Sequence, residues 1–100
     1  MTTDLTATLE ERGKRYGRFT GHARITQELK RVIKEHTPGL RFLESGTTAP
    51  HLAPDQQEAL DMICHKIGRI INGDPDYADS WIDIAGYAQL VADRLNGVER

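Results

Sequence analysis

The chain has a single cysteine, Cys64, and no apolar run long enough to cross a bilayer. A lone cysteine excludes an internal disulfide and is typical of a reducing compartment. The first residues, MTTDLTATLEERGK, lack the apolar stretch of a signal peptide. We therefore expect a cytoplasmic protein without a membrane partner, and we interpret Cys64 as a small apolar residue on a helix.

No segment shows the alternation that is typical of a strand, and apolar residues recur instead at helical spacing. The spacing predicts four helices in one domain of 100 residues. They span residues 5–16, 20–36, 54–71 and 75–95. We expect Gly13 to interrupt the first helix and Thr20 to cap the second. The fold class that follows is all-α, a small helical bundle over residues 1–100.

Two connections differ sharply in length. Residues 37–53, TPGLRFLESGTTAPHLA, are rich in Gly, Pro, Thr and Ser, so we expect a flexible loop that serves as a lid, as a partner surface or as neither. The connection NGDP at residues 72–75 is short, with Asn72 and Gly73 ending one helix and Pro75 opening the next. So short a link predicts that the last two helices form an antiparallel hairpin.

Charge is distributed unevenly, although the net charge is only −2. Residues 1–43 hold nine Lys or Arg against five Asp or Glu, which gives +4, and residues 44–100 hold four against ten, which gives −6. A basic half can hold phosphates and an acidic half can hold a divalent cation. The open alternative is that oppositely charged helices simply pack together. DNA is the partner we expect least, because the basic residues are dispersed and no helix-turn-helix pattern is present.

The fourth predicted helix carries apolar residues on two faces. The stripe that we expect to be core contains Tyr77, Trp81, Ile84, Ala85, Ala88, Val91, Ala92 and Leu95. The other side carries Asp79 and Asp83 together with Gly86 and Tyr87. Glycine in mid-helix costs about 1 kcal/mol relative to alanine, so something is expected to pack close to it. We expect this second face to be covered by the N-terminal helices or by another subunit.

Carboxylates on the last two helices form a candidate metal site. Glu58, Asp61, His65 and Arg69 are spaced by three, four and four residues, so they share one face of a helix. Counting back through the tight hairpin places Asp83 near that face. Hard oxygen ligands suit Mg²⁺ or Mn²⁺, which can in turn hold a diphosphate. The predicted metal ligands are Glu58, Asp61, Asp79 and Asp83, and the alternative is that these side chains are simply solvated.

Several segments resemble a family of small proteins of unknown function, encoded mostly by phages and prophages. They are ERGKRYGRF, the basic helix after it, and PDQQEALDMICHKIGRIINGDPDYADSWIDIAGYAQLVADRL, most specifically HKIGRIINGDP and DSWIDIAGYA. More distantly, the Tyr-Gly turn, HKIGRI and Asp-x-x-x-Asp-x-x-x-Tyr are similar to the MazG-like all-α nucleotide pyrophosphatases. In that group a Glu-x-x-Glu helix and a Glu-x-x-Asp helix bind Mg²⁺, which holds a nucleoside triphosphate for attack by water.

This resemblance implies roles for individual residues. Glu58 and Asp61 correspond to the first acidic pair, Asp83 to the final aspartate, and Asp79 to an acid one turn earlier, with Mg²⁺ or its substitute Mn²⁺ as cofactor. Ser80 stands where the usual glutamate would be, and aspartates reach less far than glutamates, so no catalytic residue is assigned. Phosphate or base contacts are implied for Tyr16, Lys66, Arg69 and Tyr87, with His65 and Lys30 as further candidates.

Three functions follow as hypotheses. The first is a Mg²⁺-dependent nucleoside triphosphate pyrophosphatase, or a nucleotide-binding protein, in the cytoplasm of a bacterial host. The second is a non-catalytic phage protein that sequesters a nucleotide-like signal. The third is an inhibitor of a host defence protein that acts through residues 37–53 or the acidic face. Members of the pyrophosphatase group commonly form dimers or tetramers, so we also expect a homo-oligomer.

Overall fold

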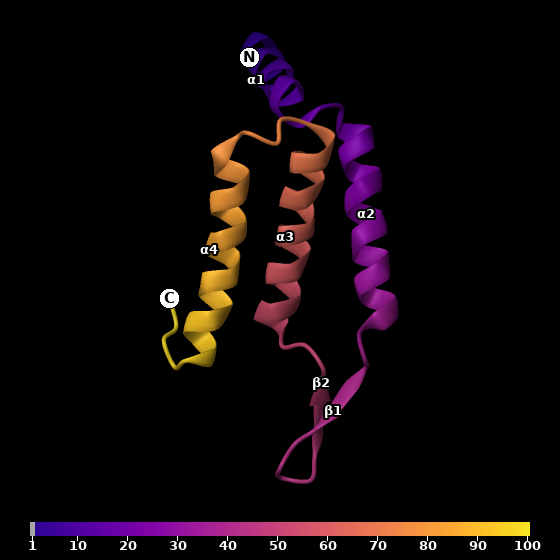
Figure 1. Ribbon diagram of the computed structural model, residues 1–100, viewed down its shortest axis with the longest axis vertical. Coiled ribbons are helices and arrows are strands. Elements are labelled where there is room, and N and C mark those ends of the chain that lie inside the picture. Colours follow the sequence, from indigo (N-terminus) through magenta and orange to yellow (C-terminus); the bar gives the residue numbers. More distant parts are fainter. Residues whose placement is uncertain (1) are drawn as a thin grey trace.

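The computed structural model describes residues 2–100, with side chains from residue 4 onward. The elements in order are α1 (Thr2–Tyr16), α2 (Phe19–His36), β1 (Leu40–Phe42), β2 (Thr48–Pro50), α3 (Pro54–Asn72) and α4 (Ala78–Leu95). Helices α2, α3 and α4 lie side by side with α3 in the middle, and α1 continues beyond one end of the three (Figure 1). The expected small helical fold, with an antiparallel hairpin of the last two helices, is confirmed.

Small side chains allow α2 to approach α3 closely. Cys64 and Gly68 are buried on α3, and His22 and Thr26 are buried on α2. A Cβ atom on Gly68 would lie 2.5 Å from Oγ1 of Thr26 and 2.8 Å from Cδ2 of His22, so a side chain at this position would force the helices apart. Burial raises the pKa of the Cys64 thiol, which keeps it protonated and fits its role as a packing residue.

The contact between α3 and α4 uses only one edge of the stripe that the sequence marks as core. The least exposed line along α4 runs through Ser80, Ile84, Tyr87 and Val91, of which Ile84 and Val91 belong to the predicted stripe. Trp81 is 55% exposed and Leu95 is 59% exposed, so the prediction that these two residues are core in this chain is wrong. The second face was expected to be covered by the N-terminal helices or another subunit. A Cβ on Gly86 would meet no atom within 4 Å, so nothing in the described chain packs closely on Gly86 itself. Asp83 and Tyr87 of the same face are half-buried, and Asp83 pairs with Lys66, so this part of the face is covered by α3 and not by the N-terminal helices.

Ion pairs fix α4 against α3 at two levels. Lys66 Nζ lies 3.0 Å from Asp83 Oδ2 in the middle of the pair. At the open end of the hairpin, Arg94 donates two hydrogen bonds to Asp55, at 2.8 and 2.7 Å. The Arg94 guanidinium lowers the pKa of the Asp55 carboxyl through these bonds. Bidentate geometry of this kind sets the register of one helix on the other.

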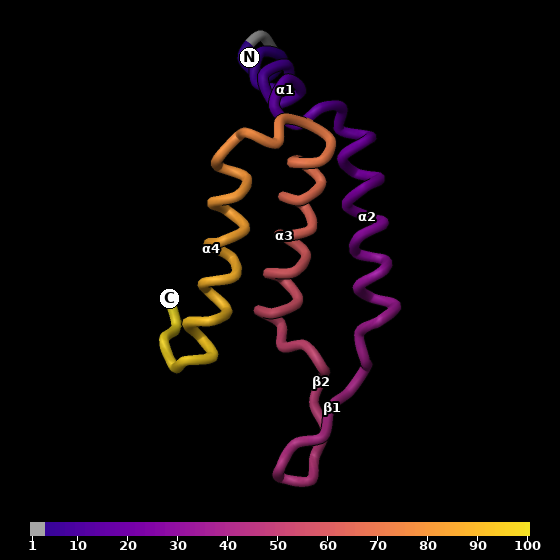
Figure 2. Tube along the Cα trace, in the orientation of Figure 1, coloured from indigo at the N-terminus to yellow at the C-terminus, as the bar shows by residue number. Residues whose placement is uncertain are grey.

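Residues 37–53 were expected to be a loop, and the structure corrects this. Strands β1 and β2 pair antiparallel, with Phe42 opposite Thr48. The turn closes because Leu43 and Thr47 are hydrogen bonded and Gly46 adopts a φ of 86°, a conformation that glycine reaches without steric cost. This hairpin projects from the end of the molecule opposite to α1 (Figure 2). The high content of Gly and Thr therefore marked a hairpin instead of an unstructured loop.

Helix boundaries also differ from expectation. Helix α1 continues through Gly13, and the residue that precedes α2 is Arg18, so Thr20 lies inside the helix and does not cap it. Helix α4 begins only at Ala78, because the Asp74 side chain accepts a hydrogen bond from the backbone N–H of Asp76 and forms a turn there. Between residues 2 and 100, no helix is long and apolar enough to cross a membrane.

Candidate functional site: a basic pocket where three helices meet

The turn at Gly17 and the turn at Gly73 interlock. The Asn72 side chain donates hydrogen bonds to the backbone oxygens of Tyr16 and Arg18, each at 2.8 Å. A Cβ on Gly17, whose φ is 75°, would lie 2.2 Å from the Asn72 carbonyl oxygen. A Cβ on Gly73 would lie 2.1 Å from the carbonyl oxygen of Arg15. Only glycine fits at both positions, so these turns fix the end of α1 against the end of α3.

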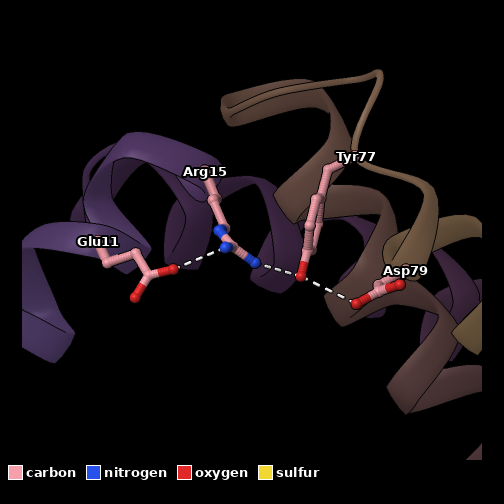
Figure 3. Close-up of polar contacts among 4 residues, drawn as sticks. All are labelled: Glu11, Arg15, Tyr77 and Asp79. Atoms are coloured by element: carbon pink, nitrogen blue, oxygen red, sulfur yellow. Dashed lines mark hydrogen bonds and ion pairs between the residues drawn. The ribbon is translucent and has the colours of Figure 1, made fainter.

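A chain of polar contacts adds a second attachment for α1. Glu11 accepts a hydrogen bond from Arg15 at 2.6 Å, Arg15 donates another to the Tyr77 hydroxyl, and that hydroxyl donates to Asp79 at 2.9 Å (Figure 3). The Arg15 guanidinium also lies over the Tyr77 ring, 4.5 Å from its centre. Because Tyr77 must keep its proton to donate to Asp79, this bond raises the pKa of the phenol. The network holds the segment that carries Tyr16.

Together these contacts shape a basic pocket of about 420 Å³ at the junction of α1, α2 and α3. We call it the basic pocket, and its lining residues are Leu9, Arg12, Gly13, Tyr16, Gly17, Arg18, Phe19, His22, His65 and Arg69. Three arginines face this space and no carboxylate does. The Arg69 guanidinium lies over the Tyr16 ring, 4.1 Å from its centre, so the aromatic face holds the cation in place.

Two histidines form the floor of the basic pocket. The buried His22 lies with Nε2 2.9 Å from the backbone oxygen of His65, so Nε2 carries a proton and donates. The two rings meet edge to face with centres 4.5 Å apart. Burial and the positive charge of Arg69 lower the pKa of His65 to about 4. His65 is therefore neutral near pH 7, and the fixed positive charge of the pocket comes from its arginines.

Three of the six predicted nucleotide contacts lie in the basic pocket, and the other three lie elsewhere. Tyr16, Arg69 and His65 come together in the basic pocket. Lys66 does not, because it points toward α4 and pairs with Asp83. Tyr87 lines grooves beside α4. Lys30 lies on α2 close enough to Cys64 and His65 to affect their pKa values, but it does not line the pocket.

Three of the four predicted metal ligands have separate partners. Asp61 accepts a hydrogen bond from Gln57, Asp79 accepts one from Tyr77, and Asp83 pairs with Lys66. Glu58 lines a cavity of about 530 Å³ between the start of α3 and the end of α4. Across the described residues, no three His, Cys, Asp or Glu side chains are grouped so that they could hold a metal ion. The role of these four residues in binding Mg²⁺ stays a prediction.

A family model described as "Domain of unknown function (DUF6378)" matches residues 2–95. The chain belongs to this family. A search of curated proteins and a search of solved structures gave no significant match. The family match covers every element of the fold, so the interlocked turns and the basic pocket both lie inside the family domain.

The sequence alone did not indicate most of the residues that line the pocket in this family member. Arg12, Arg18, Phe19 and His22 line it beside the predicted residues. A signal was present, because ERGKRYGRF concentrates basic and aromatic residues around the Tyr16–Gly17 turn. Asn72 was interpreted only as a helix end, whereas its amide ties that turn in place. Such a contact between residues 56 positions apart leaves no periodic trace in the sequence.

Proposed function

We propose that this protein binds a nucleotide, or a similar phosphorylated anion, in the basic pocket. The observation that carries the proposal is that Arg12, Arg18 and Arg69 line one cavity without a carboxylate among the lining residues. The ion pairs found in the described part of the chain use other cations, so these guanidinium groups keep their donors for a ligand. Arginine is well suited to phosphate because its planar group donates two parallel hydrogen bonds.

The shape of the pocket supports a ligand with both a charged and a flat part. Tyr16 and Phe19 place aromatic rings on its wall, and a nucleobase stacks favourably on such rings. Arg12 and Arg18 are exposed at its rim, where phosphate groups can reach them. His65, which is neutral, offers a hydrogen bond without adding charge. A nucleoside phosphate combines these features better than inorganic phosphate does.

The proposal is tested by calorimetric titration with ribo- and deoxyribonucleoside triphosphates and with inorganic pyrophosphate. Arg12→Gln and Arg18→Gln are each expected to weaken binding about tenfold or more, since a hydrogen bond to a charged group contributes about 1.5–3 kcal/mol. Arg41→Gln removes the same charge from the exposed strand β1 and should leave affinity unchanged. Equal losses in all three variants would show only a general charge effect and would contradict the assignment.

Hydrolysis of the bound nucleotide is the second candidate. It is supported by the resemblance to MazG-like pyrophosphatases and by the position of Glu58 and Asp61 on the same helix as His65 and Arg69. The same titrated samples, supplied with Mg²⁺ or Mn²⁺, are assayed for release of pyrophosphate. Turnover that is lost in Asp61→Asn and Asp83→Asn supports an enzyme. Binding without turnover for any triphosphate supports a binder.

A binder without activity fits a phage protein that sequesters a nucleotide signal, and phage origin is part of this hypothesis. Inhibition of a host defence protein is the remaining alternative, and the exposed side chains of Leu40 and Phe42 on the β1–β2 hairpin are the observation that favours it. Stoichiometric capture of a host protein that depends on Phe42 would support inhibition. A homo-oligomer is part of the proposal, because the helices leave much apolar surface exposed.

A further inference from the structure

The layer formed by α2, α3 and α4 has two different sides. Glu58 of α3 and Leu90 of α4 line one groove, and Arg69 of α3 and Phe19 of α2 line the basic pocket. These residues define the pocket side. Residues about half a turn away on each helix face the opposite side, which we call the open side. Its apolar members are Ile25 and Val32 of α2, Leu60, Ile63, Ile67, Ile70 and Ile71 of α3, and Trp81, Ala85, Ala88, Ala92 and Leu95 of α4, and the exposed Glu28 of α2 lies on the same side.

The open side is apolar along α3 and α4, with its α4 residues exposed and its α3 residues other than Ile71 half-buried. Ile71 is 63% exposed and Leu95 is 59% exposed, values that are unusual for such large side chains. Among residues 4–100 no large side chain is fully buried, and the only buried hydrophobic residues are Ala59 and Cys64. A helix layer is stable when its apolar face packs on a second layer. In this chain the second layer is missing.

The chain exposes more surface than a compact monomer of its length. The chain exposes 7536 Å², whereas a compact monomer of this length exposes about 5,700 Å². Its radius of gyration is 17.0 Å, against about 13 Å for a compact domain of this length. The excess area is about 1,800 Å², to which the projecting α1 and the β1–β2 hairpin also contribute. Half of the excess is still enough for the roughly 800 Å² per partner of a stable interface.

The spacing of residues on α4 identifies the partner. Trp81 and Leu95 lie seven residues before and seven residues after Ala88, and Ala85 and Ala92 flank it with small side chains. A two-fold axis at Ala88 therefore places Trp81 of one copy opposite Leu95 of the other. Small residues between these anchors let two helices approach closely. This stripe of α4 contains no charged residue that would oppose an identical surface.

We propose that a second copy of this chain covers the open side and forms a two-layer homodimer, with the two α4 helices antiparallel about Ala88. The inference rests on the self-association in the proposed function and is independent of which ligand the basic pocket takes. Both basic pockets stay accessible, because they lie on the outer surfaces of the two layers. The exposed part of the predicted stripe, from Trp81 to Leu95, then becomes part of the core of the dimer.

Disulfide trapping tests the position of the axis. Ala88→Cys is expected to give about tenfold more disulfide-linked dimer than Gln89→Cys, because only facing residues bring their Cα atoms within about 7 Å. Gln89 is the matched control, since it is exposed and points away from the open side on the same helix. The natural Cys64 is buried, so the wild type gives the background. Trapping at position 89 and not at 88 would show self-association through another face and would overturn the interface.

Solution mass and fluorescence test self-association itself. Light scattering on the wild type is expected to give twice the chain mass, and a monomer at all concentrations, or a complex with a foreign protein, would overturn the proposal. Trp81 is the only tryptophan, so its emission reports on this face alone. The emission is expected to shift to longer wavelength on dilution as the dimer dissociates. Trp81→Ser should give a monomer, whereas Phe42→Ser on the hairpin should remain a dimer, and equal behaviour of the two variants would contradict the assignment.

Discussion

At the scale of the residue, the chemistry of the basic pocket depends on which groups are charged near pH 7. Arg69 is held over the Tyr16 ring, and His65 lies one helical turn before it. His65 is flanked by Arg69 and His22 and lies near Lys66 and Lys30, and these neighbours together with burial lower its pKa. A neutral imidazole beside fixed guanidinium groups gives a site whose charge does not vary across the physiological pH range.

The lowered pKa of His65 predicts how stability depends on pH. Its pKa falls from 6.5 to about 4 on folding, so the unfolded chain binds more protons between these values and stability is lost as pH drops through that window. We expect His65→Asn to remove this loss, which we place at about 1 kcal/mol at pH 5 after allowing for solvent screening. Urea titrations at pH 7 and pH 5 measure it.

The exposed His51, changed to Asn, is the control for the same loss of a titratable ring. It should leave the pH dependence of stability as it is in the wild type. If the difference in unfolding free energy between wild type and His65→Asn were the same at both pH values, the role assigned to His65 would be wrong.

At the scale of the element, α3 is the scaffold of the fold. It contacts α1, α2 and α4, and its small residues set how closely α2 approaches. Gly68 meets Thr26 and His22 on α2, and His22 in turn bonds the backbone of His65. The Thr26 hydroxyl is buried at this contact without a hydrogen-bond partner among the described residues. The close approach of α2 and α3 therefore depends on the small size of the side chains and not on a hydrogen bond from Thr26. The same contact positions the floor of the basic pocket.

Two glycine substitutions separate packing from helix propensity. Gly68→Ala is expected to lower the free energy of unfolding by about 1–3 kcal/mol, because the added methyl group overlaps Thr26 and His22. Gly86→Ala should raise it by about 0.5–1 kcal/mol, because alanine favours a helix and this position is open. Denaturant titration gives both values. A stabilised Gly68→Ala variant would contradict the close approach of α2 and α3.

At the scale of the whole molecule, the fold is one layer of three helices that buries few apolar side chains, so little hydrophobic burial stabilises it. The ion pairs between α3 and α4 and the interlocked turns beside α1 specify geometry more than they add stability, since partly exposed ion pairs contribute little. The chain is elongated, with extents of 57, 30 and 29 Å. An isolated copy with this shape buries too little apolar surface to be very stable.

The proposed dimer therefore predicts that thermal stability depends on protein concentration. Mass action adds about 1.4 kcal/mol for each tenfold rise in concentration, which corresponds to about 3–6 °C in Tm for a dimer of this size. Thermal unfolding followed by circular dichroism over a hundredfold range of concentration measures the shift. The Trp81→Ser variant should show a lower Tm that is the same at every concentration, whereas a constant Tm in the wild type would argue against a dimer.

The sequence by itself determined the helical class, the antiparallel hairpin at NGDP and the apolar stripes, because these follow from local periodicity and from turn chemistry. It also marked Tyr16, His65 and Arg69, which the structure brings into one pocket. Only the tertiary structure decided that Arg12, Arg18 and Asn72 belong with them, since this depends on how α1 meets α3. It likewise decided that Lys66 and Asp83 pair across the hairpin, and that of the predicted stripe only the edge with Ile84 and Val91 faces α3, while Trp81 stays exposed. Periodicity shows which faces are apolar, but the partner of each face is set by the packing of the whole chain.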